Sequence, residues 1–268
     1  MGRRPRRWKR AAVLAPLLLL LGGLVARAIP IVAKPKQTFA TFATPTPLPQ
    51  GSVLIIGFLG GWEKWDDAHR GVRKFALRLR EKNLPGVYVE TVENHHRELA
   101  VELVKRALDR NHDGVLDDNE RRSARVILFG QSFGGAAVNK CSRELEALGV
   151  PVLLSVQVDS VGRDAGLVPA NVRRAVNFYQ KNDAFFIRGE DDFRAADPRK
   201  TEILGNFRWN YSGKNVDLSD GHWYQKVFRN AHVKMEQDPE LWDAVEPYIL
   251  REIEALRRQD QSVARSQR

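Results

Sequence analysis

The sequence contains a single cysteine, Cys141, and no internal repeat. One thiol cannot form an internal disulfide, so packing alone must hold the fold together even if the chain is exported. Cys141 falls among the apolar positions of a predicted helix, and we expect it to behave as a small buried hydrophobic residue.

The sequence also lacks a nucleic-acid-binding motif, although its net charge is +10. Much of the excess positive charge lies in the first ten positions and in the tail beyond Leu256, and no basic stripe with interleaved aromatic residues is found. The charge therefore gives no indication of nucleic-acid binding. The length of 268 residues fits one α/β domain with a short N-terminal extension.

Residues 11–25 carry no charge and directly follow the basic run. A cationic start, an apolar stretch and then Ala26-Arg27-Ala28 are typical of a secretory signal with a cleavage site between small residues. If the signal is not cleaved, the apolar stretch would anchor the chain with its basic end in the cytoplasm. We predict a signal peptide or signal anchor over residues 1–33, and a domain that is periplasmic, extracellular or held at the outer face of the cytoplasmic membrane.

Residues 34–50 are rich in threonine and proline and are predicted to be an extended tether. The folded domain is predicted to span residues 51–258, and residues 259–268 to be a basic tail. Within the domain, strand-like and helix-like segments alternate, which predicts an α/β fold with a mainly parallel sheet flanked by helices. The predicted strands are 52–58, 87–92, 126–130, 152–158 and 175–180, and the predicted helices are 66–82, 96–110, 134–148 and 238–258, with 184–230 irregular and aromatic.

Gly130-Gln131-Ser132-Phe133-Gly134 is a G-x-S-x-G motif. It follows an apolar strand and leads into a helix, which is the context that a catalytic serine on a sharp turn requires. Small residues on either side of the serine let the strand and the helix approach closely, and the helix N-terminus favours negative charge that develops there. We predict that Ser132 is a nucleophile with an exposed hydroxyl.

A serine hydroxyl is a poor nucleophile unless a base accepts its proton and an acid orients that base. In hydrolases with this motif, the order along the chain is serine, acid, histidine. His232 comes shortly before the final predicted helix and is the favoured base, and His222 remains the alternative. The earlier histidines are disfavoured by this order: His69, His95, His96 and His112.

Two aspartates follow predicted strands after the serine. Asp159 follows strand 152–158 and Asp183 follows strand 175–180. Sites of open α/β sheets lie at the carboxyl ends of their strands, so either residue could orient the base. We favour Asp159 and retain Asp183 as the alternative.

An oxyanion hole needs backbone N–H groups near the nucleophile. One is expected from Phe133, the residue after the serine. The other is expected from the loop after the first predicted strand, at Leu59 and Gly60, because glycine lets the backbone come close to a substrate.

Together these segments resemble the α/β-hydrolase superfamily, in a lipase/esterase-like or thioesterase-like bacterial branch. The resemblance covers residues 51–258 and includes GFLGG, GQSFGG, QVDSVG, NFYQ and AHVKMEQDP. The QVDSVG segment is similar to the acid segment of some lipases, which adds to the preference for Asp159. The resemblance implies a serine hydrolase acting on a small-molecule or lipid ester. A trimmed sheet and the lack of a long cap insertion leave the substrate's identity open, and the oligomeric state is open as well.

Residues 109–120, DRNHDGVLDDNE, match the pattern of an EF-hand calcium loop. Such a loop binds Ca²⁺ through oxygens at positions 1, 3, 5, 7, 9 and 12, with glycine at position 6. Because no second loop is found to pair with it, we predict a structural Ca²⁺ ion rather than a sensor. The predicted ligands are Asp109, Asn111, Asp113, the Val115 carbonyl, Asp117 and Glu120.

Two functions remain open at this point. The favoured one is a calcium-stabilised esterase-like hydrolase, and the alternative is a non-catalytic, exported calcium-binding module that keeps the same fold. Six aromatic residues are candidates for an acyl pocket: Trp62, Trp65, Phe133, Phe185, Phe186 and Trp223.

Overall fold

The computed structural model describes residues 36–163, 165–184 and 187–266. One compact unit begins at Gln37. The predicted signal or anchor over residues 1–33 lies outside the described residues, as do Phe185 and Phe186. None of the helices within the described ranges has the length and apolar character needed to cross a membrane.

The centre of the unit is a six-stranded sheet in the order β2-β1-β3-β4-β6-β8. Every neighbouring pair of strands is parallel. The strands are β1 (Val53–Leu59), β2 (Val87–Glu93), β3 (Val126–Gln131), β4 (Val152–Val158), β6 (Val172–Gln180) and β8 (Glu202–Trp209). A separate two-stranded sheet is formed by β5 (Leu167–Val168) and β7 (Arg194–Ala195).

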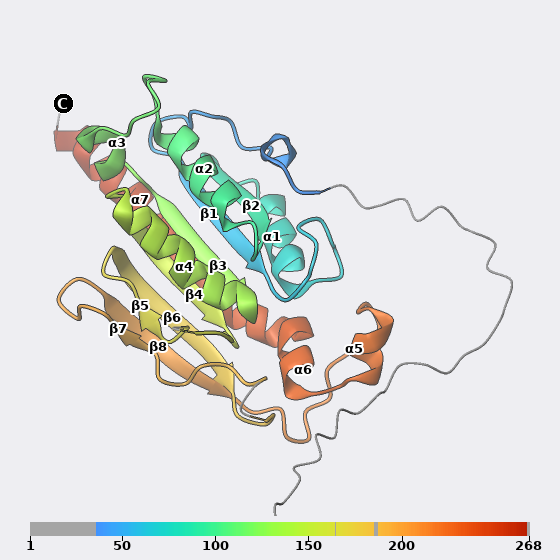
Figure 1. Cartoon of the computed structure of the whole chain (residues 1–268). Helices are drawn as coiled ribbons and strands as arrows, with labels where there is room; N and C mark the ends of the chain where they lie inside the picture. Colours follow the sequence, from blue (N-terminus) through green and yellow to red (C-terminus); the bar gives the residue numbers. More distant parts are fainter. Residues whose placement is uncertain (1–35, 164, 185–186, 267–268) are drawn as a thin grey trace, which may run out of the picture. The chain divides into compact units, whose positions relative to one another are not determined.

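Helices cover both faces of the large sheet (Figure 1). One hydrophobic cluster joins one face of the sheet to α1 (Gly71–Glu81), α6 (Ala231–Gln237) and α7 (Pro239–Ser266). A second cluster joins the other face to α2 (Arg97–Leu108) and α4 (Phe133–Ala147). The remaining helices are short: the 3-10 turn η1 (Phe39–Thr41), α3 (Asp118–Arg122) and α5 (Trp223–Val227). The predicted mainly parallel sheet flanked by helices is confirmed.

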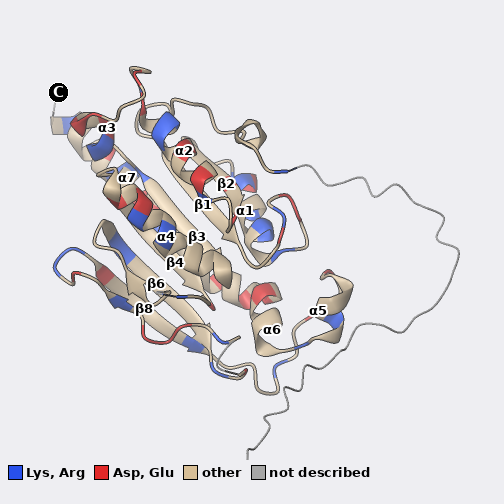
Figure 2. Ribbon diagram, viewed as in Figure 1, with Lys and Arg blue, Asp and Glu red and all other residues tan. Residues whose placement is uncertain are grey.

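The inner strands are formed by uncharged, largely apolar runs that are buried at every position in β1, β3 and β4. Such runs are expected where helices cover both faces of a parallel sheet. Successive side chains alternate between the two clusters, with Ile55 in one and Leu54 in the other. Charged residues of both signs lie instead on the helices and loops around these strands (Figure 2).

The prediction that residues 184–230 are irregular is wrong for β8, which pairs with β6 at the edge of the sheet. No residue of β8 is fully buried, so this strand lacks the apolar run by which the inner strands were recognised. Its pairing also contains a register shift between Ala175 and Val176 on the β6 side. An edge strand of mixed polarity leaves little signal in the sequence.

Residues 37–50 belong to the segment 34–50 that was predicted to be an extended tether, but they lie against the domain instead. The backbone N–H groups of Ala43 and Thr44 donate to Glu90 Oε1 at 2.8 and 2.9 Å. Leu48 N donates to the Ala107 carbonyl at 2.8 Å. Glu90 is buried on the edge strand β2, and a buried carboxylate requires such donors. At the other end, α7 continues through the predicted tail to Ser266.

Candidate active site

Ser132 stands at the sharp turn between β3 and α4, with φ 59° and ψ −128°. This left-handed conformation is strained for a residue with a Cβ. The flanking glycines make the turn possible, since a Cβ at Gly130 would collide with the Gly134 carbonyl and one at Gly134 with the Phe58 carbonyl. The strand-turn-helix context predicted for the motif is therefore present. Ser132 was also predicted to be exposed, but it is only 8% exposed.

The favoured histidine lies beside this serine. His232 is the second residue of α6, and its Nε2 is 2.9 Å from Ser132 Oγ. Its other ring nitrogen, Nδ1, is 2.6 Å from Asp159 Oδ2. The structure thus brings Ser132, His232 and Asp159 together in one chain of contacts, with each imidazole nitrogen facing a different partner.

Asp159 follows the last residue of β4 and is fully buried. Gly189 N donates to its Oδ1 at 2.6 Å, and Gln180 Nε2 donates to its Oδ2 at 3.1 Å. These bonds fix the carboxylate in front of the imidazole. Sequence reasoning missed Gln180 and Gly189, although Gln180 ends a predicted strand next to Asp183.

Asp183, the alternative acid, holds the backbone of α6 rather than the imidazole ring. Its two carboxylate oxygens accept from Ala231 N at 3.0 Å and His232 N at 2.7 Å. A carboxylate at the first turn of a helix satisfies N–H groups that have no partner within the helix. Asp183 therefore helps to set where α6 begins, and with it the position of His232.

His222, the alternative base, belongs to a different pair. Its Nε2 is 2.6 Å from Asp67 Oδ2, and its ring stacks on Tyr224 with an interplanar angle of 4°. His222 precedes α5 as its N-cap residue. The structure brings it to Asp67 rather than to Ser132.

The predicted oxyanion donors differ in whether their N–H groups already have a hydrogen-bond partner. Phe133 is the first residue of α4, so its N–H has no partner within the helix. Leu59 is the buried last residue of β1. Gly60 passes so close that an added Cβ would lie 3.1 Å from Ser132 Cβ, but its N–H donates to Glu63 Oε2 at 3.0 Å. Gly60 could donate to a bound oxygen only after leaving this carboxylate.

Glu63 belongs to a buried ionic cluster that the sequence did not reveal. Arg70 Nη1 lies 3.2 Å from Glu63 Oε1 and 3.4 Å from Glu236 Oε2. Glu236 is on α6, four residues after His232, and also accepts from Gln225 Nε2 at 2.7 Å. Burial and the nearby Glu236 raise the pKa of Glu63 to about 8. The cluster ties the loop after β1 to the helix that carries the imidazole.

The charge state of His232 follows from its neighbours. Burial lowers the pKa of this imidazole, but the hydrogen bond and charge of Asp159, with the charges of Glu236 and Asp183, raise it above its usual value overall. In its neutral form the ring can hold a proton on Nδ1 toward Asp159 and present Nε2 to Ser132. That arrangement can accept the proton of the hydroxyl.

We compared the chain with known proteins. No protein-family model matches the sequence, and no curated protein is detectably similar to it. Among solved structures, a dienelactone hydrolase-like promiscuous phosphotriesterase from metagenomic libraries has 12% identity and a TM-score of 0.42, with 82% of this chain and 95% of that chain covered.

Two further solved structures are similar at the same level. A cutinase-like protein from Cryptococcus sp. has 13% identity and a TM-score of 0.39, with 79% of this chain and 98% of that chain covered. An esterase/lipase from an uncultured bacterium has 13% identity and a TM-score of 0.36, with 80% and 78% covered. Similarities at this level do not indicate an activity.

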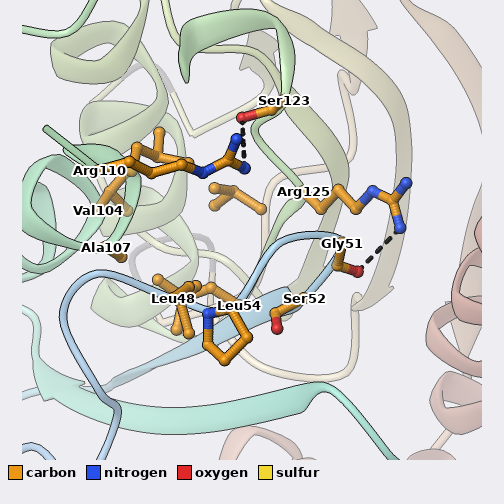
Figure 3. Close-up of a pocket in the computed structure, with 12 residues that line it drawn as sticks. Leu48, Gly51, Ser52, Leu54, Val104, Ala107, Arg110, Ser123 and Arg125 are labelled. Atoms are coloured by element: carbon orange, nitrogen blue, oxygen red, sulfur yellow. Dashed lines mark hydrogen bonds between the residues drawn. The ribbon is translucent and has the colours of Figure 1, made fainter. Parts of the chain in front are cut away.

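Figure 3 shows the residues that line a small cavity at the opposite end of the strands. It has a volume of about 10 Å³, which is roughly the space needed by one water molecule. Arg110 donates to Ser123 Oγ at 3.2 Å, and Arg125 donates to the Gly51 carbonyl at 2.9 Å along its wall. Its lining includes residues at the start of β1, at the start of β3 and at the end of α2, whereas Ser132 follows the end of β3.

The raised pKa of His232 can be measured directly by NMR titration of its ring protons. The folded protein should hold the imidazole proton to a higher pH than the unfolded chain does, and Asp159→Asn should lower the midpoint because a neutral amide no longer favours the imidazolium. A midpoint at or below that of the urea-unfolded chain would contradict the assigned contacts.

Proposed function

We propose that this chain is a serine hydrolase that cleaves ester or thioester bonds, with Ser132 as nucleophile, His232 as base and Asp159 as the orienting acid. The supporting observation is the unbroken series of contacts from Ser132 Oγ to His232 Nε2 at 2.9 Å and from His232 Nδ1 to Asp159 Oδ2 at 2.6 Å. A nucleophile, a base within hydrogen-bond reach and a third group that orients the base are what acyl transfer through serine requires.

In the proposed reaction, Ser132 Oγ attacks the substrate's carbonyl carbon while its proton passes to His232 Nε2. Asp159 stabilises the imidazolium that forms, without taking the proton itself. His232 then gives the proton to the departing alcohol or thiol, which leaves an acyl group on Ser132. Water then attacks this acyl group while His232 takes its proton. As the bond to Ser132 Oγ breaks, His232 returns the proton to Oγ and the carboxylic acid is released.

The negative oxygen formed in each step would be bound by backbone N–H groups. Phe133 N–H is one donor, aided by the N-terminus of α4. Gly60 N–H is the second once it leaves Glu63. A protonated Glu63 accepts a hydrogen bond more weakly than a carboxylate does, so its pKa of about 8 favours release of this donor below that pH.

An apolar acyl group fits the side chains near Ser132. Phe133 directly follows the nucleophile and is 50% exposed, and Trp62, two residues after Gly60, is 88% exposed. Trp223, whose ring contacts that of Tyr224, is also exposed. Exposed aromatic rings of this size gain most by covering apolar surface of a ligand, which favours a small-molecule or lipid ester.

We also propose that the enzyme acts outside the cytoplasm. Its support is the sequence of residues 1–33, where a basic start precedes an apolar stretch and a small-x-small site. An uncleaved segment would hold the enzyme at the outer face of the cytoplasmic membrane, close to lipid esters.

Hydrolysis of p-nitrophenyl esters of graded acyl length tests the central assignment. Ser132→Ala should lower kcat/KM by at least about 1,000-fold, because no other group can form the acyl intermediate. It should also abolish labelling by a fluorophosphonate probe. Ser212→Ala, which removes an exposed hydroxyl elsewhere, should retain both. Absence of labelling in the folded, calcium-loaded wild type would instead favour the non-catalytic binding module.

Calcium at residues 109–120 is the second part of the proposal. The turns of this loop are closed by side chains at the predicted ligand positions. Asp109 Oδ2 accepts from Gly114 N at 3.0 Å, and Asn111 Oδ1 accepts from Asp113 N at 3.0 Å. Asp109 Oδ1 is buried and has no hydrogen-bond partner in the described chain. A cation would supply the missing partner for this oxygen.

At the end of the loop, the carboxylate of Glu120 already accepts two hydrogen bonds. Glu120 Oε1 accepts from Arg110 N at 2.7 Å, and its Oε2 accepts from Asp117 N at 2.9 Å. To bind an ion, this carboxylate must share or leave these bonds. The loop leads through α3 into β3, so an ion there would stabilise the strand that ends at the nucleophile.

Thermal unfolding tests this ion. Calcium at ten times its Kd should stabilise the fold by about 1.4 kcal/mol, which raises Tm by about 3–5 °C for a domain of this size. Asp109→Asn should remove the shift, since it keeps the side chain's shape but loses its charge. Asp118→Asn, on an exposed carboxylate at a non-ligand position, should keep it. An unchanged wild-type Tm at 10 mM calcium would refute the site.

A further inference from the structure

A tight turn at the carboxyl end of β2 gathers one carboxylate and two imidazoles. Glu93 is the last residue of β2, and His96 N donates to its carbonyl at 2.9 Å, which closes the turn. Potential ligand atoms of Glu93, His95 and His96 lie within 4.8 Å of one another. In the ranges that the structure describes, this is the one group of three His, Cys, Asp or Glu residues found so close together.

The carboxylate at the centre of this group is short of partners. The Glu93 side chain is 0% exposed, and its Oε2 accepts no hydrogen bond from any described residue. His95 Nε2 lies 3.0 Å from this oxygen. Two ligands of a tetrahedral zinc ion, each about 2.0–2.1 Å from the metal, lie about 3.3 Å apart. The separation of these two atoms is therefore close to that of neighbouring zinc ligands.

The second imidazole is already oriented by another carboxylate. His96 Nδ1 lies 2.9 Å from Glu98 Oε1. A proton held on Nδ1 by this contact leaves the lone pair of Nε2 available. Metal-binding histidines commonly donate their other ring N–H to a carboxylate in this way, which fixes the tautomer and raises the basicity of the ligand.

We propose that Glu93, His95 and His96 bind a zinc ion, with water completing a four-coordinate shell. Two imidazoles and one carboxylate are a donor set suited to zinc, whereas Ca²⁺ takes oxygen ligands alone. His95 is exposed and His96 half-buried, so an ion can enter from solvent. The site shares no residue with Ser132, His232 and Asp159 or with the loop 109–120.

Lys64 is a positive charge that competes with the ion for the same carboxylate. Its Nζ lies 3.5 Å from Glu93 Oε1, and its side chain is 38% exposed. A long pair with a partly solvated ammonium is weak and can open without burying a charge. Removal of this ammonium by Lys64→Gln should therefore increase zinc affinity, whereas it would have no such effect if Lys64 were unrelated to the site.

The site adjoins the loop beside the nucleophile. Asn94 Nδ2, between Glu93 and His95, donates to the Gly61 carbonyl. The Trp62 ring lies 5.7 Å from the His95 ring, centroid to centroid. A zinc ion would hold the turn rigid and, through these contacts, brace the loop that runs past Ser132.

Calorimetric titration of the full chain with Zn²⁺ tests the proposal, after removal of metals by a chelator and in saturating Ca²⁺ so that the loop 109–120 does not take up zinc. We expect one Zn²⁺ per chain. Glu93→Gln and His95→Asn should each weaken binding by at least about 100-fold, Glu98→Gln by about 10-fold, and Lys64→Gln should tighten it.

His112→Asn is the matched control, because it removes an exposed histidine outside the cluster at a position with φ 60°, which asparagine tolerates. It should bind zinc as the wild type does. Circular dichroism identifies any variant that fails to fold, and His95→Asn, on the surface, keeps the test valid if Glu93→Gln unfolds. Binding that is unchanged in His95→Asn, or absent in the wild type at 100 μM Zn²⁺, would overturn the proposal. Neither result depends on hydrolase activity.

Discussion

The fully buried carboxylate of Asp159 is the group on which the geometry of the site depends. A carboxylate that is buried away from water is tolerated only if its oxygens accept hydrogen bonds from the protein. The donors come from separate segments: Gln180 at the end of β6, Gly189 in the loop beyond it, and His232 on α6. The hydrogen bonds to the two carboxylate oxygens of Asp159 therefore hold three separate parts of the chain around the serine turn.

The helix that carries His232 is fixed at several points as well. Asp183 accepts from its first N–H groups, and Glu236 at its other end joins the cluster of Arg70 and Glu63. Because Glu63 also accepts from Gly60 N–H, the helix that carries the imidazole and the loop beside Ser132 are linked through Glu63, Arg70 and Glu236. A displacement of α6 would therefore move both the imidazole of His232 and the loop beside Ser132.

The parts of the site that are set locally could be predicted from the sequence. The serine turn needs glycine where backbone approaches backbone, so GQSFG in its context indicated Ser132. Chain order, with a position just before the final helix, favoured His232. Asp159 and Asp183 both follow strands, and the similarity of QVDSVG to the acid segment of some lipases added to the preference for Asp159. The structure brings His232 and Asp159 to the serine. The roles of Asp183 and Glu63 depend on how distant loops pass one another, which no local pattern records. The edge strand β8 and the docked segment 37–50 were missed because each depends on a partner elsewhere, β6 in one case and the buried Glu90 in the other.

The central claim is that Asp159, rather than Asp183, orients the imidazole toward Ser132. The most direct measurement is the rate at which a fluorophosphonate reacts with Ser132 in the two isosteric variants Asp159→Asn and Asp183→Asn, both verified as folded. The account predicts a loss of about 10,000-fold for Asp159→Asn, through the wrong tautomer of His232, and a much smaller loss for Asp183→Asn, which alters only the start of α6. Reaction of Asp159→Asn at the wild-type rate, or an equal loss in Asp183→Asn, would contradict it.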